Sequence, residues 1–559
     1  MIKRFKIFTL FLLFFTGMVV SGQAQETTPS ERGEIRDTEF IIRKDRVLSL
    51  PQQPRVLEKT PDLPPVISNP SYDYQVKDFF IDLQPLQVQT QPFVKPFQPE
   101  TTFQSLGRAK IGYGNYASPL LQLNINNFFE DEMSYGLHLS HEGYYLGPVD
   151  GNNSAEDHTQ LGLNGSLFTD FIEFYGRLGY QRDLHHFYGY SPIPSLEIIP
   201  EDIRQVFNTV ETTIGLRRIE KAEPFDYGAS ASFRLFEDNY AAEESEGNVK
   251  VNADFRPNEQ LKGGIAAMFF FTTPSDVNYS DITRNYFKLH PHVTYLYGGI
   301  HLNIGANVIQ ENDIVPNKTK DLFIFPTAFL SYHFAPEFGV YGRYEGDVLR
   351  KTYFDFVMEN PYLGPSTELR NTIQNHQVDA GISGTLAGNL DYEAGIEFGN
   401  YTNMHFYGNN VNDSTRFELL YDNESQMFNF HASANYKFEK RYQLEANLNY
   451  YQYYLTELEA AWHRPLWEFG LKNTFIPQEE WMIQANINAM GGIDVINMAS
   501  ESTDTLKPLL DLHISVDYAI NPRLSVFAKG NNLLNQNYER FQNYRVRGIQ
   551  GIGGIGFKF

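Results

Sequence analysis

The sequence predicts an all-β protein, a transmembrane antiparallel β-barrel of about 22 strands with short periplasmic turns and long extracellular loops. Three observations predict this fold: many long segments of alternating polarity, a regular exchange of tight and long connections between them, and an aromatic-rich composition. The chain has 559 residues, with 35 Tyr, 45 Phe, 3 Trp and no Cys. Its mean hydropathy is nevertheless only -0.39.

The composition excludes several classes of protein. Without cysteine there is neither a disulfide framework nor a thiolate metal site. The mean hydropathy is too low for a bundle of membrane-spanning helices, and the aromatic content is too high for a disordered chain. The 45 basic and 68 acidic side chains give a net charge of -23, whereas a protein that binds nucleic acid needs a basic face. We therefore expect no nucleic-acid partner.

Residues 1–24 have the layout of a secretory signal peptide. Lys3, Arg4 and Lys6 precede an apolar run that ends in small residues near Ala24. The alternative is an uncleaved membrane anchor, but the apolar run is shorter than the ~20 residues that a spanning helix needs. No cysteine follows it, which excludes a lipid anchor at that position.

Residues 25–106 form a polar, proline-rich arm or linker. Proline removes backbone donors and favours extended or turn geometry, so little regular structure is expected here. Short apolar patches, such as residues 39–42 and 79–81, could add a strand to a partner protein. A disordered spacer is the alternative.

Residues 107–559 are predicted to form the barrel, because apolar residues recur there at every second position. Runs of this kind include Leu121, Leu123 and Ile125; Ile300, Leu302, Ile304, Ala306 and Val308; Phe428, Phe430, Ala432, Ala434, Tyr436 and Phe438; and Tyr442, Leu444, Ala446, Leu448 and Tyr450. A soluble β-sandwich also alternates. Its strands are typically about five or six residues long, however, whereas these segments reach the roughly ten residues that cross a bilayer at a tilt.

The connections between the segments favour the barrel further. Tight turns are expected near residues 168–170, 256–259, 335–337, 387–389, 438–440 and 521–522, and long polar links near 144–157, 184–203, 274–284, 350–374, 403–425 and 531–547. Tight turns on one side and long loops on the other are typical of outer-membrane barrels. Aromatic residues at segment ends predict girdles at the membrane interfaces, as at Phe187, Tyr188, Tyr190, Tyr451, Tyr453 and Tyr454.

The C-terminus resembles the signal that directs barrels to the outer-membrane assembly machinery. Gly554, Phe557 and Phe559 match three of its four defined positions, and Ile552 stands where a polar residue is usual. The same tail spells a dinucleotide-binding fingerprint over residues 551–556. That fingerprint requires a strand followed by a helix, and only three residues remain after it, so close-packed strand glycines are the better interpretation.

Other candidate sites are weak, and we expect no catalytic, cofactor-binding or metal-binding residues. His138 with His141, His185 with His186, and His290 with His292 form pairs, but none shows convergent ligands. Lumenal or girdle histidines are expected instead. The acidic stretches 150–153 and 243–246 could hold calcium, although solvated loops are the preferred interpretation. No nucleophile, base and orienting group form a set, so the protein is not expected to be an enzyme.

Both ends of the predicted barrel resemble a known family. Residues 107–116 and 134–141 look like the first strands of plugless barrels related to the TonB-dependent receptors, and residues 529–538 look like the receptors' penultimate strand and last outer loop. The resemblance implies uptake of iron chelates, vitamins or glycans, driven by an inner-membrane motor. The receptors carry a plug domain before the barrel, whereas here only the arm of residues 25–106 precedes it, and no energy-coupling box is visible.

Two functions follow from these expectations. The first is a transport or channel barrel of the outer membrane of a Gram-negative bacterium, with its lumen occluded by the arm, by inward-folded loops or by a partner. The alternative is a non-transporting scaffold in a larger outer-membrane complex, holding surface lipoproteins or other barrels. The expected partners are outer-membrane lipid and lipopolysaccharide, the assembly machinery during insertion, and a surface lipoprotein or periplasmic protein that contacts the loops or the periplasmic arm.

Overall fold

The computed structural model describes residues 106–559 apart from 130–131, 191–196, 220–223, 278–281, 314, 316–317, 319, 366–367 and 498–501. The predicted signal peptide of residues 1–24 and nearly all of the predicted arm, residues 25–105, lie outside the described residues. The described chain is almost entirely β, and 22 of its strands form one antiparallel sheet.

The barrel strands follow one another in chain order. They are β1 (Gly107–Gly114), β2 (Ser118–Phe129), β3 (Met133–Tyr144), β4 (Glu156–Phe168), β5 (Ile172–His186), β6 (Arg204–Arg218), β7 (Phe225–Asp238), β8 (Glu243–Phe255), β9 (Leu261–Ser275), β10 (Arg284–Tyr297), β11 (Ile300–Glu311), β12 (Leu322–Ala335), β13 (Phe338–Leu349), β14 (Thr372–Leu386), β15 (Leu390–Thr402), β18 (Ser425–Phe438), β19 (Tyr442–Tyr454), β20 (Trp467–Phe475), β21 (Trp481–Gly491), β24 (Leu509–Ala519), β25 (Leu524–Asn531) and β28 (Gln550–Lys558).

The sheet closes because the first strand pairs with the last. Gly112 of β1 lies opposite Gly554 of β28, and the same ladder runs from Arg108 with Lys558 to Gly114 with Ile552. At its end, the Gly107 and Phe559 backbones exchange two hydrogen bonds of 3.0 and 3.1 Å. Closure satisfies the backbone groups that an open edge would leave without partners, which hydrocarbon does not tolerate. The predicted closed barrel of 22 strands is confirmed.

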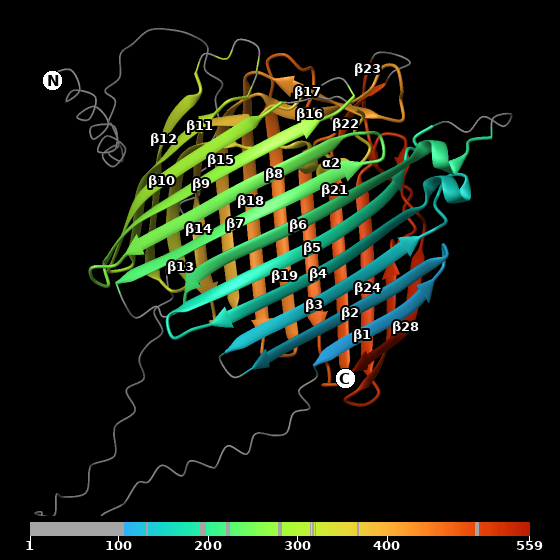
Figure 1. Cartoon of the computed structure of the whole chain (residues 1–559), viewed down its shortest axis with the longest axis horizontal. Helices are drawn as coiled ribbons and strands as arrows, with labels where there is room; N and C mark the ends of the chain where they lie inside the picture. Colours follow the sequence, from blue (N-terminus) through green and yellow to red (C-terminus); the bar gives the residue numbers. More distant parts are fainter. Residues whose placement is uncertain are drawn as a thin grey trace, which may run out of the picture. The chain divides into compact units, whose positions relative to one another are not determined.

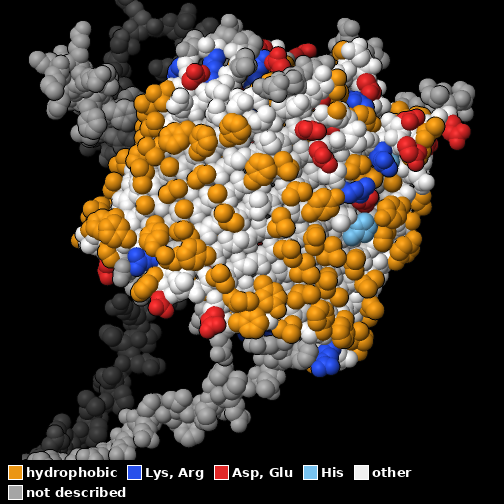
Figure 2. Space-filling view, in the orientation of Figure 1, with side chains coloured by type: hydrophobic (Ala, Val, Ile, Leu, Met, Phe, Trp, Pro, Cys, Tyr) orange, Lys and Arg blue, Asp and Glu red, His pale blue; other side chains and the backbone are white. Residues whose placement is uncertain are grey.

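Side chains alternate between an apolar outer wall and a polar interior. On β4, Leu161, Leu163 and Leu167 are exposed on the outside, while Gln160 and Asn164, at the alternate positions, face the lumen. Figure 2 shows hydrophobic side chains spread over the wall, with most charged side chains towards the strand ends. Exposed large apolar side chains in a continuous band are what a lipid environment requires.

The connections at the two ends of the barrel differ, as predicted. One end, hereafter the turn end, carries the tight connections together with the C-terminus (Figure 1). The other end, hereafter the loop end, carries the long ones, which hold the remaining elements (Figure 1). These are the 3-10 helices η1 (Gly151–Ser154) and η2 (Pro200–Ile203), the helix α2 (Tyr353–Glu359), and the hairpins β16 (Met404–Asn409) with β17 (Phe417–Asp422), β22 (Asp494–Asn497) with β23 (Ser502–Thr505), and β26 (Glu539–Phe541) with β27 (Tyr544–Arg545).

Two connections at the loop end are short, against the predicted asymmetry. They join β1 to β2 and β7 to β8, through residues 115–117 and 239–242. Within the described part of the chain, no helix is both long enough and apolar enough to cross a membrane.

Exposed aromatic side chains ring the turn end, as the girdle prediction requires. They include Phe129, Tyr135, Phe171, Phe225, Phe255, Tyr297, Phe334, Phe338, Phe438, Phe475, Trp481, Phe557 and Phe559. The residues chosen from sequence for the other girdle are mostly misplaced. Phe187 and Tyr188 are buried among the loops, and Tyr451 and Tyr453 lie on the lumen face of β19. Only Tyr454, which is 51% exposed, lies on the outer wall as expected.

The seam between β1 and β28 is tight enough to test by substitution. A Cβ atom at Gly554 would lie 2.1 Å from the carbonyl oxygen of Ile111, which is backbone and cannot yield. We expect Gly554→Val to destabilise the folded barrel by roughly 3 kcal/mol, through overpacking at the closing strand. The fraction that keeps its compact mobility in unheated gel electrophoresis should fall accordingly.

The matched control is Gly551→Val, three residues away on the same strand, where a Cβ atom would meet nothing within 4 Å. An equal loss of folded barrel in both variants would contradict the argument.

Candidate functional site: the loop cap and the lumen

Loops from opposite sides of the barrel meet at the loop end. We define the loop cap as the described residues of segments 187–203, 350–371, 403–424, 455–466 and 532–549. The first leaves the barrel between β5 and β6, and the third between β15 and β18. Eight strands separate these two hairpins on one side of the ring and ten on the other. Contact between them therefore requires the loops to extend across the mouth.

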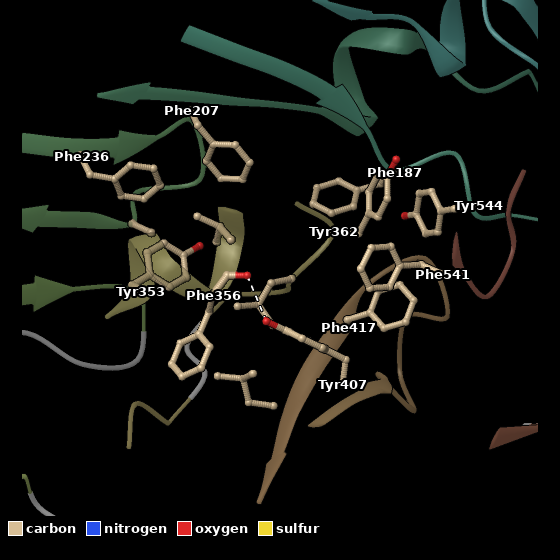
Figure 3. Close-up of a cluster of buried hydrophobic side chains, with 14 of the residues drawn as sticks. Phe187, Phe207, Phe236, Tyr353, Phe356, Tyr362, Tyr407, Phe417, Phe541 and Tyr544 are labelled. Carbon is tan, nitrogen blue, oxygen red and sulfur yellow. Dashed lines mark hydrogen bonds between the residues drawn. The ribbon is translucent and has the colours of Figure 1, made fainter. Parts of the chain in front are cut away.

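A buried aromatic cluster joins these loops (Figure 3). Tyr362 stacks on Tyr544 with ring centroids 3.5 Å apart, and Tyr188 meets Tyr544 edge-on at 4.9 Å. These three residues come from three different segments of the loop cap. The other buried members are Phe187, Phe207, Phe236, Ala242, Tyr353, Phe356, Val357, Leu363, Tyr407, Phe417, Leu419 and Phe541. This hydrophobic core is formed by the loops together with the strand residues Phe207 and Phe236 at the loop end of β6 and β7.

Polar contacts fix the same loops to one another. The Tyr188 hydroxyl donates to the carbonyl of Arg545 at 3.0 Å, and the Tyr544 hydroxyl donates to the carbonyl of Thr415. The Arg416 guanidinium lies 4.5 Å from the ring centre of Phe187, a cation–π contact between opposite sides of the barrel. Burial raises the pKa of Tyr188 to about 12 and keeps its hydroxyl protonated as a donor.

The helix α2 is held in the loop cap from both sides. Thr352 and Asp355 form a capping box at its start, which satisfies its first backbone donors. From the barrel wall, the Glu244 carboxylate accepts the Tyr353 N–H at 2.9 Å and lies 3.4 Å from the Arg234 guanidinium. The Glu244 side chain is fully buried. Glu244, a strand residue, therefore ties segment 350–371 to the barrel. This segment is the longest connection that contains no strand.

His463 joins three loops. Its Nδ1 lies 2.6 Å from the carbonyl of Tyr407, and its own carbonyl accepts from Arg540 at 2.9 Å. The ring is buried and edge-on to Phe417 at 4.9 Å. Burial, and to a smaller extent the nearby Arg540 charge, lower the pKa of His463 to about 4. His463 is therefore neutral near pH 7, and its Nδ1–H donates to the Tyr407 carbonyl.

Asp422 fixes a further contact between loops. Its carboxylate accepts the N–H groups of Glu457 and Leu458 at 2.7 and 3.1 Å, and that of Thr456 at 3.0 Å. Burial alone would raise the pKa of Asp422, but these donors and the Ser425 hydroxyl outweigh it and hold the pKa below its usual range. The segment 455–466 is thereby pinned to the hairpin β16–β17.

The lumen below the loop cap is lined by polar and charged side chains. Many carboxylates there are paired across strands, as in Lys110 with Asp517 at 2.6 Å and Lys529 with Glu142 at 2.7 Å. Both of these pairs lie near the seam between β1 and β28. Further pairs occur between Arg217 and Glu173, Lys262 and Asp254, Arg284 and Asp313, and Lys288 and Asp347.

The residues of the predicted assembly signal lie together on the last strand. Gly554 faces the lumen at the seam, and Phe557 and Phe559 are exposed, with ring centroids 6.2 Å apart. The glycines of residues 551–556 belong to β28, in agreement with the rejection of the dinucleotide fingerprint. Whether these residues act as an assembly signal stays a prediction.

The histidine pairs do not form metal sites in the part of the chain that the structure describes, where no group of three or more His, Asp or Glu residues is arranged to hold a metal ion. His290 and His292 share the lumen face, as their spacing predicts, and stack at 5.3 Å. His138 and His141 instead contact Asn124 and Thr159 separately. His185 contacts His158, whereas His186 Nδ1 lies near the carbonyl of Ala155.

The interpretation of residues 243–246 as a solvated loop is wrong. They begin β8, and Glu244 and Glu246 are buried on its lumen face, where Arg234 lies 3.4 and 3.3 Å from them. Arg234 lies on the neighbouring strand β7, 10 residues before Glu244, and Arg350 lies 104 residues after Glu246, so the acidic run alone gave no sign of these partners. The aromatic core of the loop cap was not predicted from the sequence either. The closely spaced aromatic residues of segments 353–362 and 538–544 could have indicated it, although the links that contain them are otherwise typical of solvated loops.

Comparison with known proteins identifies the fold of the chain but no relative at the level of sequence. No protein-family model matches the chain, and no curated protein sequence matches it. Among solved structures, the ferric-catecholate import receptor Fiu from Escherichia coli K12 is similar with a TM-score of 0.61 and 10% identity, over 81% of this chain and 82% of the receptor. The fold is that of outer-membrane receptor barrels.

Two further structures agree. The FrpB iron transporter from Neisseria meningitidis matches with a TM-score of 0.61 and 10% identity, over 81% of this chain and 82% of the transporter. The ferripyoverdine receptor of the outer membrane of Pseudomonas aeruginosa matches with 0.59 and 10%, over 81% and 71%. At this identity the likeness concerns the fold alone.

Removing the Glu244 carboxylate should release α2 from the barrel wall. In Glu244→Ala the Tyr353 N–H loses its acceptor and Arg234 loses one of two buried partners. We expect the loop cap to lose about 3 kcal/mol of stability. Hydrogen exchange of residues 352–360 should quicken, while the exposed neighbour Glu243→Ala should leave it unchanged. Equal exchange in both variants would exclude an anchoring role.

The loop cap should loosen in acid because of His463. An unfolded histidine has a pKa of about 6.5. Its folded pKa is lower, so the stability that needs the neutral ring is complete above pH 6.5 and is lost as the pH falls from 6.5 towards 4. The full loss amounts to roughly 3 kcal/mol for the 2.5-unit difference. Hydrogen exchange of the loops, corrected for intrinsic rates, measures it.

The control variant is His463→Asn. Asparagine tolerates the positive φ of 59° at this position, and its amide can donate to the Tyr407 carbonyl without titrating. Acid loosening should be smaller in this variant. An unchanged pH profile would assign the effect to other groups.

Proposed function

We propose that the protein is an outer-membrane transport barrel of the TonB-dependent receptor type, whose lumen is closed at the loop end by the loop cap. The observation that carries the proposal is the polar lumen closed by loops that meet across the mouth. A barrel of 22 strands encloses a water-filled lumen unless something occupies it. A wide pore would leak, and loops with a common core offer a closed state from which a regulated opening can start.

The orientation follows from the same proposal. The loop end would face the cell exterior and the turn end the periplasm, as in other barrels of this class. Residues 1–24 would direct secretion, and residues 25–106 would form a periplasmic arm in place of a plug domain. Gly554, Phe557 and Phe559 would present the signal for the assembly machinery, and the exposed apolar wall would contact outer-membrane lipid and lipopolysaccharide. We propose no enzymatic role and no cofactor.

Single-channel recording of the full-length protein in planar bilayers tests the closed state. We expect little steady conductance from the natural protein, because the loop cap blocks the lumen. In Tyr362→Ala/Tyr544→Ala the stacked pair at the centre of the cap is lost, and each truncation removes about 3 kcal/mol of packing. Open events should then become frequent.

Tyr145→Ala is the matched control, because Tyr145 is a loop tyrosine that is 44% exposed and lies outside the cluster. A large steady pore in the natural protein would contradict closure by the loops. Conductance that stays low in the double variant would mean that something other than the loop cap closes the lumen.

A second candidate function is a scaffold that holds surface lipoproteins or another barrel. One observation favours it: the loops are fixed to each other by a common core and therefore present a preorganised surface. Purification from mildly solubilised native membranes distinguishes the two. A stoichiometric surface partner supports the scaffold, and an isolated barrel argues for transport.

A further inference from the structure

One sector of the lumen wall carries several carboxylates that form no ion pair with lysine or arginine in the described structure. Seven carboxylates face the lumen on β13, β14, β15, β19 and β20, and we call them the acidic wall. They are Glu345, Asp379, Asp391, Glu393, Glu397, Glu445 and Glu468. Asp379 and Glu397 lie directly opposite each other on neighbouring strands, an arrangement of like charges that is unfavourable by itself.

The acidic wall differs in its partners from the paired lumenal carboxylates described above. Six ion pairs with lysine or arginine were described above for the rest of the lumen, whereas the described structure gives the seven carboxylates of the acidic wall no such pair. Asp379 has only His431, at 3.0 Å. Arg343 lies opposite Asp379 in the ladder but is placed over the Phe329 ring at 5.5 Å. The acidic wall therefore keeps a net negative field in a confined space, although Lys472 lies opposite Glu445 in the ladder.

A second observation in the same sector is a buried amide oxygen without a hydrogen-bond donor. Asn429 lies opposite Glu397 on the lumen face of β18, and its side chain is only 7% exposed. Its Oδ1 has no hydrogen-bond partner in the structure. Such a buried acceptor is costly unless a donor reaches it. The carboxylates and the amide oxygen all accept hydrogen bonds, so a ligand that fits them carries hydrogen-bond donors, and the carboxylates favour one that is also cationic.

The shape of the sector indicates the size of that ligand. A hollow of about 670 Å³ lies towards the turn end, lined among others by Asp391, Glu393, Glu445 and Lys472. The carboxylates are spread over neighbouring strands at roughly 5–7 Å intervals. Within the described residues no three of them converge on one metal position. An extended organic cation with several separated amines fits this pattern, and a single metal ion does not.

We propose that the acidic wall is a binding site for organic polycations of the polyamine class, entered from the turn end. Amines along one flexible chain would contact successive carboxylates, and the chain's methylenes would lie against Tyr341. The proposal deepens the proposed transport function by giving the lumen a preference for cationic solutes, and it rests on that function for its biological meaning. Binding itself requires no opening of the loop cap.

Titration calorimetry on the full-length protein in detergent tests the proposal, with spermine as the probe at about 50 mM salt, where screening is weak. We expect saturable binding that weakens as salt is raised. Glu393→Gln/Glu445→Gln should weaken it roughly tenfold, because two carboxylates of the hollow lose their charge. Asn429→Ala should weaken it as well. Citrate, which carries the opposite charge, should not bind.

The matched control is Glu259→Gln/Glu480→Gln, which removes two charges from exposed turns at the same end of the barrel. It should bind spermine as the natural protein does, and compact gel mobility should show that every variant is folded. The proposal is overturned if the natural protein fails to bind spermine, or if the lumen variant and the control bind it equally. Conductance recording is independent of this assay, so failure of the transport proposal would be seen separately.

Discussion

Backbone hydrogen bonding in hydrocarbon is the constraint on which this structure depends. A strand edge facing lipid would leave a row of N–H and C=O groups without partners, so the sheet has to close. Closure fixes the pairing of β1 with β28 and makes glycine necessary where the two strands approach most closely, as at Gly554. It also fixes which side chains face lipid and which face the lumen, because alternation along 22 paired strands leaves each residue one choice of side.

The closed sheet has no central core, and this bears on where the structure places its aromatic residues. A barrel of this width cannot be filled by its own wall side chains, so most apolar side chains of the strands face outwards, while small inward groups such as Phe270, Tyr286 and Ile309 pack together. A further aromatic cluster packs the loop residues Phe356 and Phe417 together with Phe207 at the end of β6, and all three are fully buried. The loop cap is therefore a packed layer on the rim of the barrel, tied down by Glu244, His463 and Asp422.

Charge is distributed unevenly inside this frame. Near the seam and on the β5–β11 side, several lumenal carboxylates are neutralised by lysines and arginines. The seven carboxylates of the acidic wall are not, although Arg343 and Lys472 lie opposite Asp379 and Glu445 in the ladder. The fold thus keeps a negative surface in one sector at the expense of like-charge repulsion, and a cationic solute would relieve it.

The barrel could be predicted from the sequence because the patterns that indicate it are local. Period-two alternation, strand length and turn position all act within a few residues, so the strands and tight turns could be placed from runs such as Phe428–Phe438 and turns such as 387–389. For residues whose partners are distant in sequence, only the tertiary structure decided where they lie and what they contact. Phe187 was expected at a membrane interface and instead packs against Arg416, and Glu244 was expected in a loop and instead anchors Tyr353. The physical reason is that long-range contacts depend on which loops meet across the mouth, and no local pattern encodes that.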